Sequence, residues 1–559
     1  MTQHRSSLLA SIAATCFFVF PVIGKAAPVD TAPINPAHLS ETIRALASDG
    51  FHGRSPGTEG EKVTVPYLID RFKALGLAPG GDKGGWTQNV PMLRTKPMPA
   101  MTVRLNVPNG SRSLVQFKDL CLFTVHPENH QSLDHAQLVF VGYGVHAPER
   151  GWDDFKGVDL KGKIAVILIN DPDFDASAGE AVAGKFGGRA MTYYGRWTYK
   201  YEEAAQRGAA AAIIVHDTPG ASYPWATVIA PGAEEYALED QGDKEAPPIA
   251  GWIQGDAAAA LFKSAGQDLT ALRVKARSPD FRPVPLDGVS LTVDMPVAVS
   301  HLVSQNVIGK IVGKTRPNDS ILVGAHWDAF GESQDAAGHT IIRRGANDDG
   351  AGIAAVLEVA RAFVTGPRPD RTLVFAAWTG EERGLLGSSW YAAHPLFPIA
   401  TTVANVTFDV LQTAGPARNA FIVGAGQDQL QDAFAAAAKM QGRTTSPEAE
   451  PERGAFYRAD HLPFARLGVP VLPIMGMSGD YDLVNGGVAA GARWAAGYRR
   501  CYHQPCDAWS QTWDLRGAAQ DIAAAWAVVH HLAFSDTWPG WSAGSEFAAI
   551  RASSNASRR

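Results

Sequence analysis

The C-terminal half of the chain alternates short apolar runs with amphipathic segments, and this alternation constrains the fold most. From about Asn306 onward, runs such as SILVGA, TLVFAAW and TTVANVTF alternate with segments of helical periodicity. The pattern is typical of an α/β domain with a mostly parallel central sheet flanked by helices on both faces. The runs end at Ala325, Trp378, Phe408, Ala425 and Met475. The first three lead into polar residues, so we expect a site at the carboxyl edge of the sheet.

Length and composition indicate a globular protein of at least two domains. A single hydrophobic core stops growing at roughly 250 to 300 residues, and this chain has 559 residues. Hydrophobic residues make up 46% and charged residues 19%, as in ordinary folded proteins. The formal net charge is -6 and no long basic run is present, so we exclude nucleic acid as a partner.

A change from helical segments to short strand-like runs predicts an inserted domain. Two helical segments come first, in HLSETIRALASD and VTVPYLIDRFKALGL. From Met101 to Pro296, strand-like runs such as TVRLNV and KIAVILIN are separated by Gly, Pro and Asp turns, with at least one helix in YKYEEAAQRGA. We predict a signal peptide at 1–26, an α/β domain in two parts at 27–100 and 297–545, a mostly β insert at 101–296, and a disordered tail at 546–559.

The first residues have the features of a secretory signal. Arg5 precedes an apolar stretch from about Leu8 to Ile23, and Gly24-Lys25-Ala26 offers small residues for cleavage after Ala26. The alternative is a retained membrane anchor, but the stretch is short for a span and contains Pro21. We therefore expect an exported protein, periplasmic or secreted, without a membrane anchor once the signal is removed.

The cysteines agree with an oxidising compartment. Cys16 would leave with the signal, whereas Cys501 and Cys506 are close enough in sequence to form a local disulfide. The alternative is that both are buried thiols. Cys121 has no evident partner, and we expect it to be a small buried residue.

Histidines and carboxylates follow the apolar runs and suggest a metal centre. Imidazole and carboxylate without thiolate suit zinc in a hydrolytic site, with cobalt or manganese as substitutes. Any single Asp or Glu pair is usually a solvated surface feature, but carboxylates that directly follow buried strands would be costly to bury without a cation. The candidates are His326, Asp328, Asp348, Asp349, Glu381, Glu382, Asp409 and His503.

The spacing of the acidic residues favours two metals and a separate proton carrier. Asp348 lies in GANDDGAG, just before GIAAVLEVARAF, whose apolar residues recur at helical intervals. At the N-terminus of such a helix, Asp348 can bridge two metals. Glu381 and Glu382 are adjacent on a turn, where neighbouring side chains diverge, so one can bind metal while the other faces the attacking water. Three ligand carboxylates plus one hydroxide would balance two divalent cations.

Several segments together resemble the M28 metallopeptidase family, which includes bacterial leucyl aminopeptidases and, more distantly, glutamate carboxypeptidase. They are GAHWD, GANDDGAG, WTGEERGLLGS, TFDV, RADHLPFARLGVPVL and YHQPCD, in family order, and FHGRSPGTEGE matches the family's opening loop. The resemblance implies a zinc exopeptidase fold with two zinc ions per chain. It implies that His326 and Asp409 hold one zinc, that Glu382 and His503 hold the other, and that Asp348 bridges them. Glu381 would be the general base and acid.

The resemblance extends to supporting residues and to the insert. Asp328 matches the family carboxylate that orients the zinc-binding histidine. Tyr502 is a candidate to steady the tetrahedral intermediate, by analogy with one branch of the family, and the alternative is a packed core tyrosine. Asp460 and His461 match a family motif near the site without an assigned role. The stretches GWDDFKGVDLKGKIAVILIND and RWTYKYEEAAQRGAAAAIIVHD resemble a protease-associated domain, which is non-catalytic where it occurs.

The implied activity is removal of N-terminal residues from peptides, with Glu381 passing the proton of the attacking water to the leaving amine. A carboxypeptidase or dipeptidase could use the same metals. A glutaminyl-cyclase-like acyltransferase uses a related one-zinc site, but the full ligand set favours hydrolysis. A non-catalytic binding ectodomain is the alternative from another class, and the five intact ligand positions argue against it.

Overall fold

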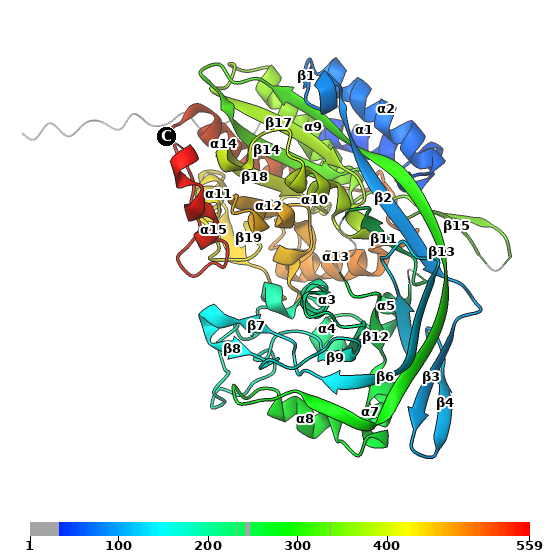
Figure 1. Ribbon diagram of the computed structural model, residues 1–559. Coiled ribbons are helices and arrows are strands. Elements are labelled where there is room, and N and C mark those ends of the chain that lie inside the picture. Colours follow the sequence, from blue (N-terminus) through cyan, green and yellow to red (C-terminus); the bar gives the residue numbers. More distant parts are fainter. Residues whose placement is uncertain (1–32, 231, 241–245, 336, 559) are drawn as a thin grey trace, which may run out of the picture. The chain divides into compact units, whose positions relative to one another are not determined.

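The computed structural model describes residues 33–230, 232–240, 246–335 and 337–558 (Figure 1). All of them belong to the unit that runs from Thr31 to Arg559. The predicted signal peptide at 1–26, with Cys16, lies outside the described residues. Within the described ranges, no helix combines the length and hydrophobicity that a membrane crossing requires.

The central sheet has the predicted mostly parallel character. Its order is β21-β18-β14-β17-β13, and only the pair β13–β17 is antiparallel. Nearly every residue at the inner ends of β14, β17 and β18 is buried, which explains why these strands read as continuous apolar runs. The strands are β13 (Val284–Ile311), β14 (Arg316–His326), β17 (Arg371–Trp378), β18 (Thr402–Phe408) and β21 (Val471–Ile474).

One predicted strand does not join this sheet. The run that ends at Ala425 contributes β19 (Asn419–Ile422), which pairs in parallel with β20 (Thr444–Pro447) in a separate two-stranded sheet. The strand is only four residues long, and the neighbouring position beside β18 is taken by β21. An apolar run shows that a segment is buried but does not show which strand it pairs with.

Helices cover both faces of the sheet. Along β14, Ile321, Val323 and Ala325 pack into one hydrophobic cluster with α1, α2, α9 and α14, whereas Leu322 packs into another with α10 and α12. This alternation is the two-residue period of a strand. The helices are α1 (Pro36–Leu46), α2 (Glu59–Ala74), α9 (Gly350–Val364), α10 (Leu386–Ala393), α11 (Gln429–Met440), α12 (Leu462–Arg466), α13 (Gly487–Cys501) and α14 (Arg516–Phe534).

A long two-stranded ribbon leads into the predicted insert (Figure 1). β2 (Thr87–Pro97) pairs antiparallel with β13 from Thr87 opposite Val307 to Pro97 opposite Val297. β13 continues without a break across the predicted boundary at Pro296 and pairs there with β3 and β6. β11 (Glu235–Leu238), which lies within the insert sequence, pairs with β2.

The insert contains strands and helices around its own hydrophobic clusters. Strands β6, β9, β10 and β12 are parallel neighbours, and β5 closes the edge antiparallel to β12. The strands are β3 (Thr102–Val107), β4 (Gly110–Leu114), β5 (Leu120–Phe123), β6 (His130–Phe140), β9 (Ile164–Leu168), β10 (Ala211–Val215) and β12 (Ile249–Ile253). The helices are α3 (Trp197–Gln206), α4 (Thr218–Ala221), α5 (Trp225–Ile229), α7 (Gly255–Ser264) and α8 (Leu269–Lys275). Short pairs are β1 (Ala78–Pro79) with β13, β7 (His146–Ala147) with β8 (Trp152–Asp153), and β15 (Gly331–Gln334) with β16 (Thr340–Arg343).

The C-terminal segment differs from the predicted disordered tail. It forms α15 (Ala548–Ser553) and a short turn of helix at Asn555–Ser557. The side chain of Arg551 is buried and donates hydrogen bonds to the main-chain oxygens of Thr402, at 3.0 Å, and Val403, at 3.4 Å. The polar composition of this segment does not reveal the anchor, because the hydrogen-bond partners of Arg551 are main-chain atoms at the start of β18.

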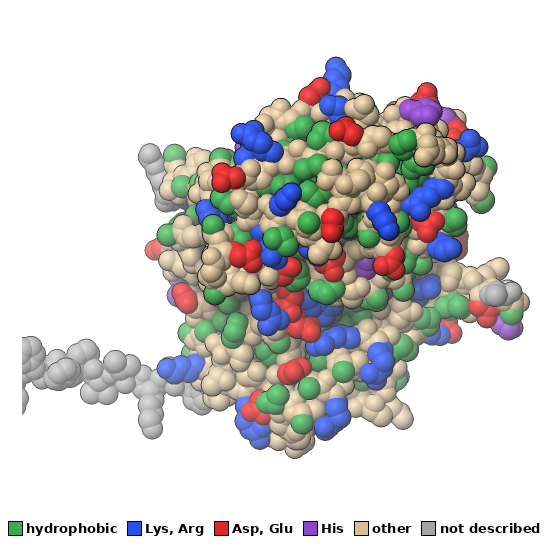
Figure 2. All heavy atoms as spheres, turned by 90° about the horizontal axis from the view of Figure 1, so that it is seen from below, with side chains coloured by type: hydrophobic (Ala, Val, Ile, Leu, Met, Phe, Trp, Pro, Cys, Tyr) green, Lys and Arg blue, Asp and Glu red, His purple; other side chains and the backbone are tan. Residues whose placement is uncertain are grey.

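Two cysteine predictions are confirmed. Cys501 and Cys506 form a disulfide, and Cys121 is a free, buried thiol in β5. Burial raises the pKa of Cys121 to about 12, so it remains a neutral, small side chain. On the face drawn in Figure 2, acidic and basic side chains are interspersed, in agreement with the modest net charge.

Candidate metal centre

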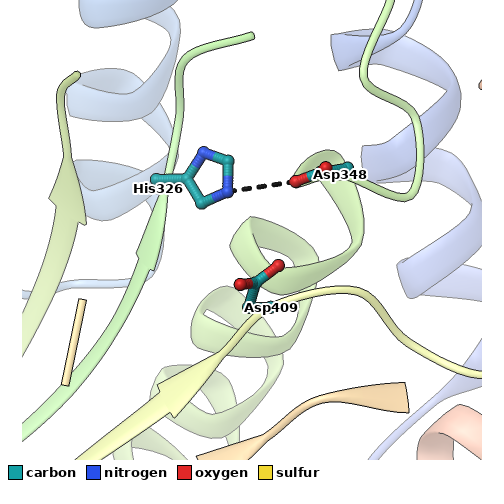
Figure 3. Close-up of side chains that lie close together, drawn as sticks. All are labelled: His326, Asp348 and Asp409. Atoms are coloured by element: carbon teal, nitrogen blue, oxygen red, sulfur yellow. Dashed lines mark ion pairs between the residues drawn. The ribbon is translucent and has the colours of Figure 1, made fainter. Parts of the chain in front are cut away.

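Three predicted ligands converge at the carboxyl edge of the central sheet (Figure 3). His326 is the last residue of β14, Asp409 directly follows β18, and Asp348 lies two residues before α9. Their potential ligand atoms lie within 4.8 Å of one another, and Nε2 of His326 is 3.2 Å from Oδ1 of Asp348. In Figure 3 the three side chains point toward a common space.

A second group shares Asp348 with the first. Nε2 of His503 is 3.2 Å from Oδ2 of Asp348 and 3.1 Å from Oε2 of Glu382. The ligand atoms of Asp348, Glu382 and His503 also lie within 4.8 Å of one another. Asp348 therefore presents one carboxylate oxygen to each histidine, which is the arrangement that a residue bridging two metals requires.

The two adjacent glutamates face different partners. They lie in a short helical turn, Glu381–Arg383, that follows β17. Glu382 faces His503, whereas Oε2 of Glu381 is 3.8 Å from Nε2 of His326. Glu381 belongs to neither three-residue group. The expected divergence of neighbouring side chains is thus present.

The carboxylate of Asp328 is closer to the main chain of this turn than to the imidazole of His326. Its carboxylate accepts hydrogen bonds from the main-chain N–H groups of Glu381, at 3.0 Å, and Glu382, at 3.3 Å. The nearest partner of Nδ1 of His326 is the main-chain oxygen of Asp328, at 3.1 Å, while the carboxylate is 3.7 Å away. Asp328 was expected to orient the imidazole through its carboxylate. Both its main-chain oxygen and its carboxylate face Nδ1 of the imidazole, and the carboxylate also bonds to the turn of both glutamates, so its orienting role stays a prediction.

Asp349 and Asp507 complete the support around Asp348. Asp349 caps α9 by accepting the N–H of Gly352 at 2.8 Å. The carboxylate of Asp507 accepts the N–H groups of Asn347 and Asp348, each at 3.0 Å. Sequence reasoning did not assign a role to Asp507, although YHQPCD contains it. Its proximity to His503 in the sequence was the available signal.

The sequence analysis also assigned no role to Arg54, although this residue lies in the segment FHGRSPGTEGE. Its side chain is 1% exposed and donates to four main-chain oxygens, those of Trp327, Leu46, Arg344 and Gly345, each at 2.7 Å. Burial lowers the pKa of the guanidinium, and the aspartates around the site oppose this effect. Arg54 therefore joins the loops on either side of the site and places a positive charge behind the carboxylates.

The loop that carries His503 is closed by the disulfide between Cys501 and Cys506. His503 has a left-handed φ of 61°, a conformation that costs a non-glycine residue about 1 kcal/mol or more. The ring of Tyr502 stacks on that of His503 with centroids 3.6 Å apart, and the ring of Phe330 is 4.6 Å away. The disulfide and the two aromatic rings together fix the imidazole.

The site carries more buried carboxylates than nearby cations can balance. Burial raises the pKa of Glu381 and of Glu382 well above the usual range, and it raises the pKa of Asp409 to about 7. For Asp348, burial acts in the same direction, but the two adjacent histidines outweigh it and lower the pKa of the carboxyl. An added positive charge would therefore stabilise the ionised form of these groups.

Unpartnered atoms indicate where such a charge would bind. Nε2 of His326, Nε2 of His503 and Oδ2 of Asp348 are buried. Despite their short contacts with one another, none of them forms a hydrogen bond of regular geometry within the described residues. Buried polar atoms without partners are uncommon and call for an explanation. Imidazole nitrogen and carboxylate oxygen are typical zinc ligands, so the donor set fits two zinc ions. A small hollow beside Glu382 and His503 is also lined by Phe330 and Arg343.

Asp460 and His461 lie outside both ligand groups. The hydroxyl of Ser388 donates to Oδ1 of Asp460 at 2.5 Å, and burial raises the pKa of this carboxyl to about 7. Nε2 of His461 is 2.6 Å from the main-chain oxygen of Phe456, and burial lowers the pKa of His461 to about 4. His461 is therefore a neutral residue of the core near pH 7.

Comparisons with known proteins identify a family that matches part of the chain. Residues 306–527 match the family described as Peptidase family M28. Leupeptin-inactivating enzyme 1 of Streptomyces exfoliatus is 28% identical over 218 residues, which cover 38% of this chain and 45% of that protein. Aminopeptidase Y of Saccharomyces cerevisiae is 28% identical over 271 residues, 45% of this chain and 43% of that protein. The matches thus span less than half the length of either relative.

Among solved structures, an aminopeptidase from Aneurinibacillus sp. strain AM-1 is 22% identical with a TM-score of 0.49, covering 90% of this chain and 95% of that one. The part of the chain that matches peptidase family M28, residues 306–527, contains all the predicted metal ligands.

Proposed function

We propose that this chain is a zinc exopeptidase that removes N-terminal residues from peptides and binds two zinc ions. The observation that carries the proposal is that two groups of ligands share Asp348. His326 and Asp409 would hold one ion with Asp348, and Glu382 and His503 would hold the other. Zinc bound there would supply an acidified water and a Lewis acid for the scissile carbonyl.

Glu381 is the proposed general base and acid. Its carboxylate lies beside the ligands without belonging to either group, so it can take a proton from the attacking water and give it to the leaving amine. The N–H contacts from the Glu381 and Glu382 main chain to Asp328 fix the turn. Asp328 therefore keeps the base and the ligand on their separate sides.

Tyr502 is the proposed donor to the oxygen that becomes negatively charged. Burial raises the pKa of its hydroxyl well above the usual range, so the group stays protonated and can donate a hydrogen bond. Its stacking against His503 places it next to the ligand groups.

We also propose that the protein is exported and that residues 101–296 form a protease-associated domain beside the substrate cleft. The disulfide between Cys501 and Cys506 supports an oxidising compartment. Attachment of the insert through β2 and β13 supports a fixed position for it.

Metal analysis combined with a substrate panel tests the proposal. Purified protein should bind two zinc ions, lose activity on chelation and cleave aminoacyl amides but not N-blocked peptides. Glu381→Ala should abolish turnover and retain both ions, whereas Asp409→Ala or His503→Ala should lose one. One tight ion at saturation would refute the two-metal centre. An emptied site in Glu381→Ala would exchange the roles of Glu381 and Glu382.

A further inference from the structure

One strand of the insert contacts the turn at Glu381–Arg383. β11 pairs with β2, β2 pairs with β13, and β13 pairs with β17, the strand that precedes this turn (Figure 1). Tyr236 in β11 is 6% exposed and packs in a hydrophobic cluster with Met92 of β2 and Leu386, the first residue of α10. Because α10 follows the turn directly, the insert reaches the part of the α/β domain that supplies two of the predicted site residues.

Arg383, the last residue of the turn, contacts two aromatic rings. Its Cζ is 4.9 Å from the ring centroid of Tyr236 and 5.1 Å from that of Phe330. Phe330 lies in the loop after β14, and its ring centroid is 4.6 Å from that of His503. Tyr236, Arg383 and Phe330 are called the cation–π cluster below. The cluster forms a continuous series of contacts from the insert to a proposed metal ligand.

The two rings restrain the side chain of Arg383. Nε of Arg383 is buried and, within the described part of the chain, has no hydrogen-bond partner. A guanidinium near an aromatic face is attracted by the ring quadrupole, and the attraction strengthens as water is excluded. Loss of the ring of Tyr236 would therefore release the side chain of Arg383, and with it one end of the turn.

Asp328 holds the other end of the turn. Its carboxylate accepts the main-chain N–H groups of Glu381, at 3.0 Å, and Glu382, at 3.3 Å. The first two residues of the turn are thus fixed by hydrogen bonds, and the third is held by aromatic contacts. Both ends must be held to fix the direction in which the side chain of Glu382 leaves the main chain.

We propose that the cation–π cluster positions the second metal site, which consists of Asp348, Glu382 and His503. The inference rests on the proposed two-zinc centre and gives the insert a part in it. Glu382 directly precedes Arg383, and His503 contacts Phe330, so two of the three ligands adjoin the cluster. Tyr236 acts through these ligands and does not need to touch the metal or the substrate. Residues that orient the ligands of a metal commonly set its affinity.

Single-site backgrounds allow the zinc affinity of each site to be measured by itself in the full-length protein. Asp409→Ala should retain only the second ion, and His503→Ala only the first. In the Asp409→Ala background, Arg383→Met and Tyr236→Leu should each weaken zinc binding roughly 3- to 30-fold, the range that a partly desolvated cation–π contact supports. In the His503→Ala background, the same changes should leave the affinity within about 2-fold. Competition with a chromogenic chelator measures both.

Conservative and matched variants separate positioning from packing. Tyr236→Phe keeps the aromatic face and should retain the zinc affinity of its parent. Arg150 is the matched control, because its Cζ lies 5.4 Å from each of two ring centroids within the insert, those of Phe186 and Tyr194. Arg150→Met and Arg383→Met should lower the free energy of unfolding in urea with chelator by comparable amounts, but only Arg383→Met should weaken zinc binding. Equal effects of the two variants on zinc binding would reduce the cluster to a packing contact.

A double-mutant cycle and the zinc measurements together decide the inference. The losses of affinity in Arg383→Met and Tyr236→Leu should not add, because either change breaks the same series of contacts. Weaker binding at the second site in both variants supports the cluster even if the parent cleaves no peptide, a result that would refute the peptidase alone. Unchanged binding in either variant overturns the cluster even if the peptidase is active. Asp409→Ala protein that binds no zinc would refute the two-metal centre and the cluster together.

Discussion

Asp507→Ala tests whether the loop that carries Asp348 depends on a buried carboxylate. Asp507 is 3% exposed and accepts the N–H groups of Asn347 and Asp348, each at 3.0 Å. Removing the carboxylate leaves two buried donors without partners, at about 1–3 kcal/mol each. We therefore expect the free energy of unfolding to fall by about 2–6 kcal/mol. Asp507→Asn keeps one acceptor oxygen and should lose about half as much.

The measurement is urea unfolding followed by tryptophan fluorescence, with chelator present so that metal release does not contribute. Zinc affinity, measured separately by competition with a chromogenic chelator, should fall about 10- to 100-fold, because loss of a partner that orients a ligand has that effect. Because Asp348 is the proposed bridge between the two ions, the binding of both should weaken.

Asp536→Ala is the control, because Asp536 is fully exposed and pairs with Arg316 at the surface. Such a pair contributes about 0–1 kcal/mol. If Asp507→Ala unfolded within about 0.5 kcal/mol of the parent and bound zinc equally well, the two hydrogen bonds would not be supporting the site, and the reasoning from unsatisfied donors would be wrong.

Three further predictions concern other parts of the molecule. Burial lowers the pKa of His461 from 6.5 to about 4. The free energy of unfolding should therefore fall by up to about 3 kcal/mol as the pH is lowered from 6.5 toward 4. His461→Gln, which retains an N–H donor but does not titrate, should flatten that part of the unfolding curve, and an unchanged slope would contradict the assignment. Replacing both Cys501 and Cys506 by Ser should lower the free energy of unfolding by about 2 kcal/mol and weaken zinc binding at His503. Denaturant unfolding and metal competition measure the two effects. Unchanged zinc binding would show that the disulfide does not position His503. Deleting Met101–Pro296 joins strands that are already paired, since Pro97 lies opposite Val297. The product should bind zinc and cleave leucine p-nitroanilide, whereas a folded, zinc-loaded and inactive product would require the insert to supply a catalytic group.

The fold and the position of the site could be predicted because they depend on local patterns. Buried parallel strands have continuous apolar sequences, so their ends at Ala325, Trp378 and Phe408 could be located before pairing was known. In a parallel sheet, the residues that follow these ends must lie at the same edge. Asp348 could be placed because the helix after it has a clear period.

The contacts that support the site left no comparable pattern. Arg54 and Asp507 bond to main-chain atoms, and any residue can supply a main-chain N–H or C=O. A partner of this kind cannot be identified from residue types. The same reason explains Arg551, which anchors the C-terminal helix on main-chain oxygens of β18. Pairing was equally hidden for β19, because a buried run fits any sheet with a free edge.

The proposed chemistry is confined to the α/β domain. All five proposed metal ligands and the proposed base lie within residues 306–527, the part that matches the peptidase family. The insert lies outside that part and is attached to it through β2 and β13, which pair in a fixed register. Changes in the insert can therefore alter the substrate group that is recognised while the metal ligands stay in place. On this argument, the substrate preference of related chains should vary with the insert rather than with the metal ligands.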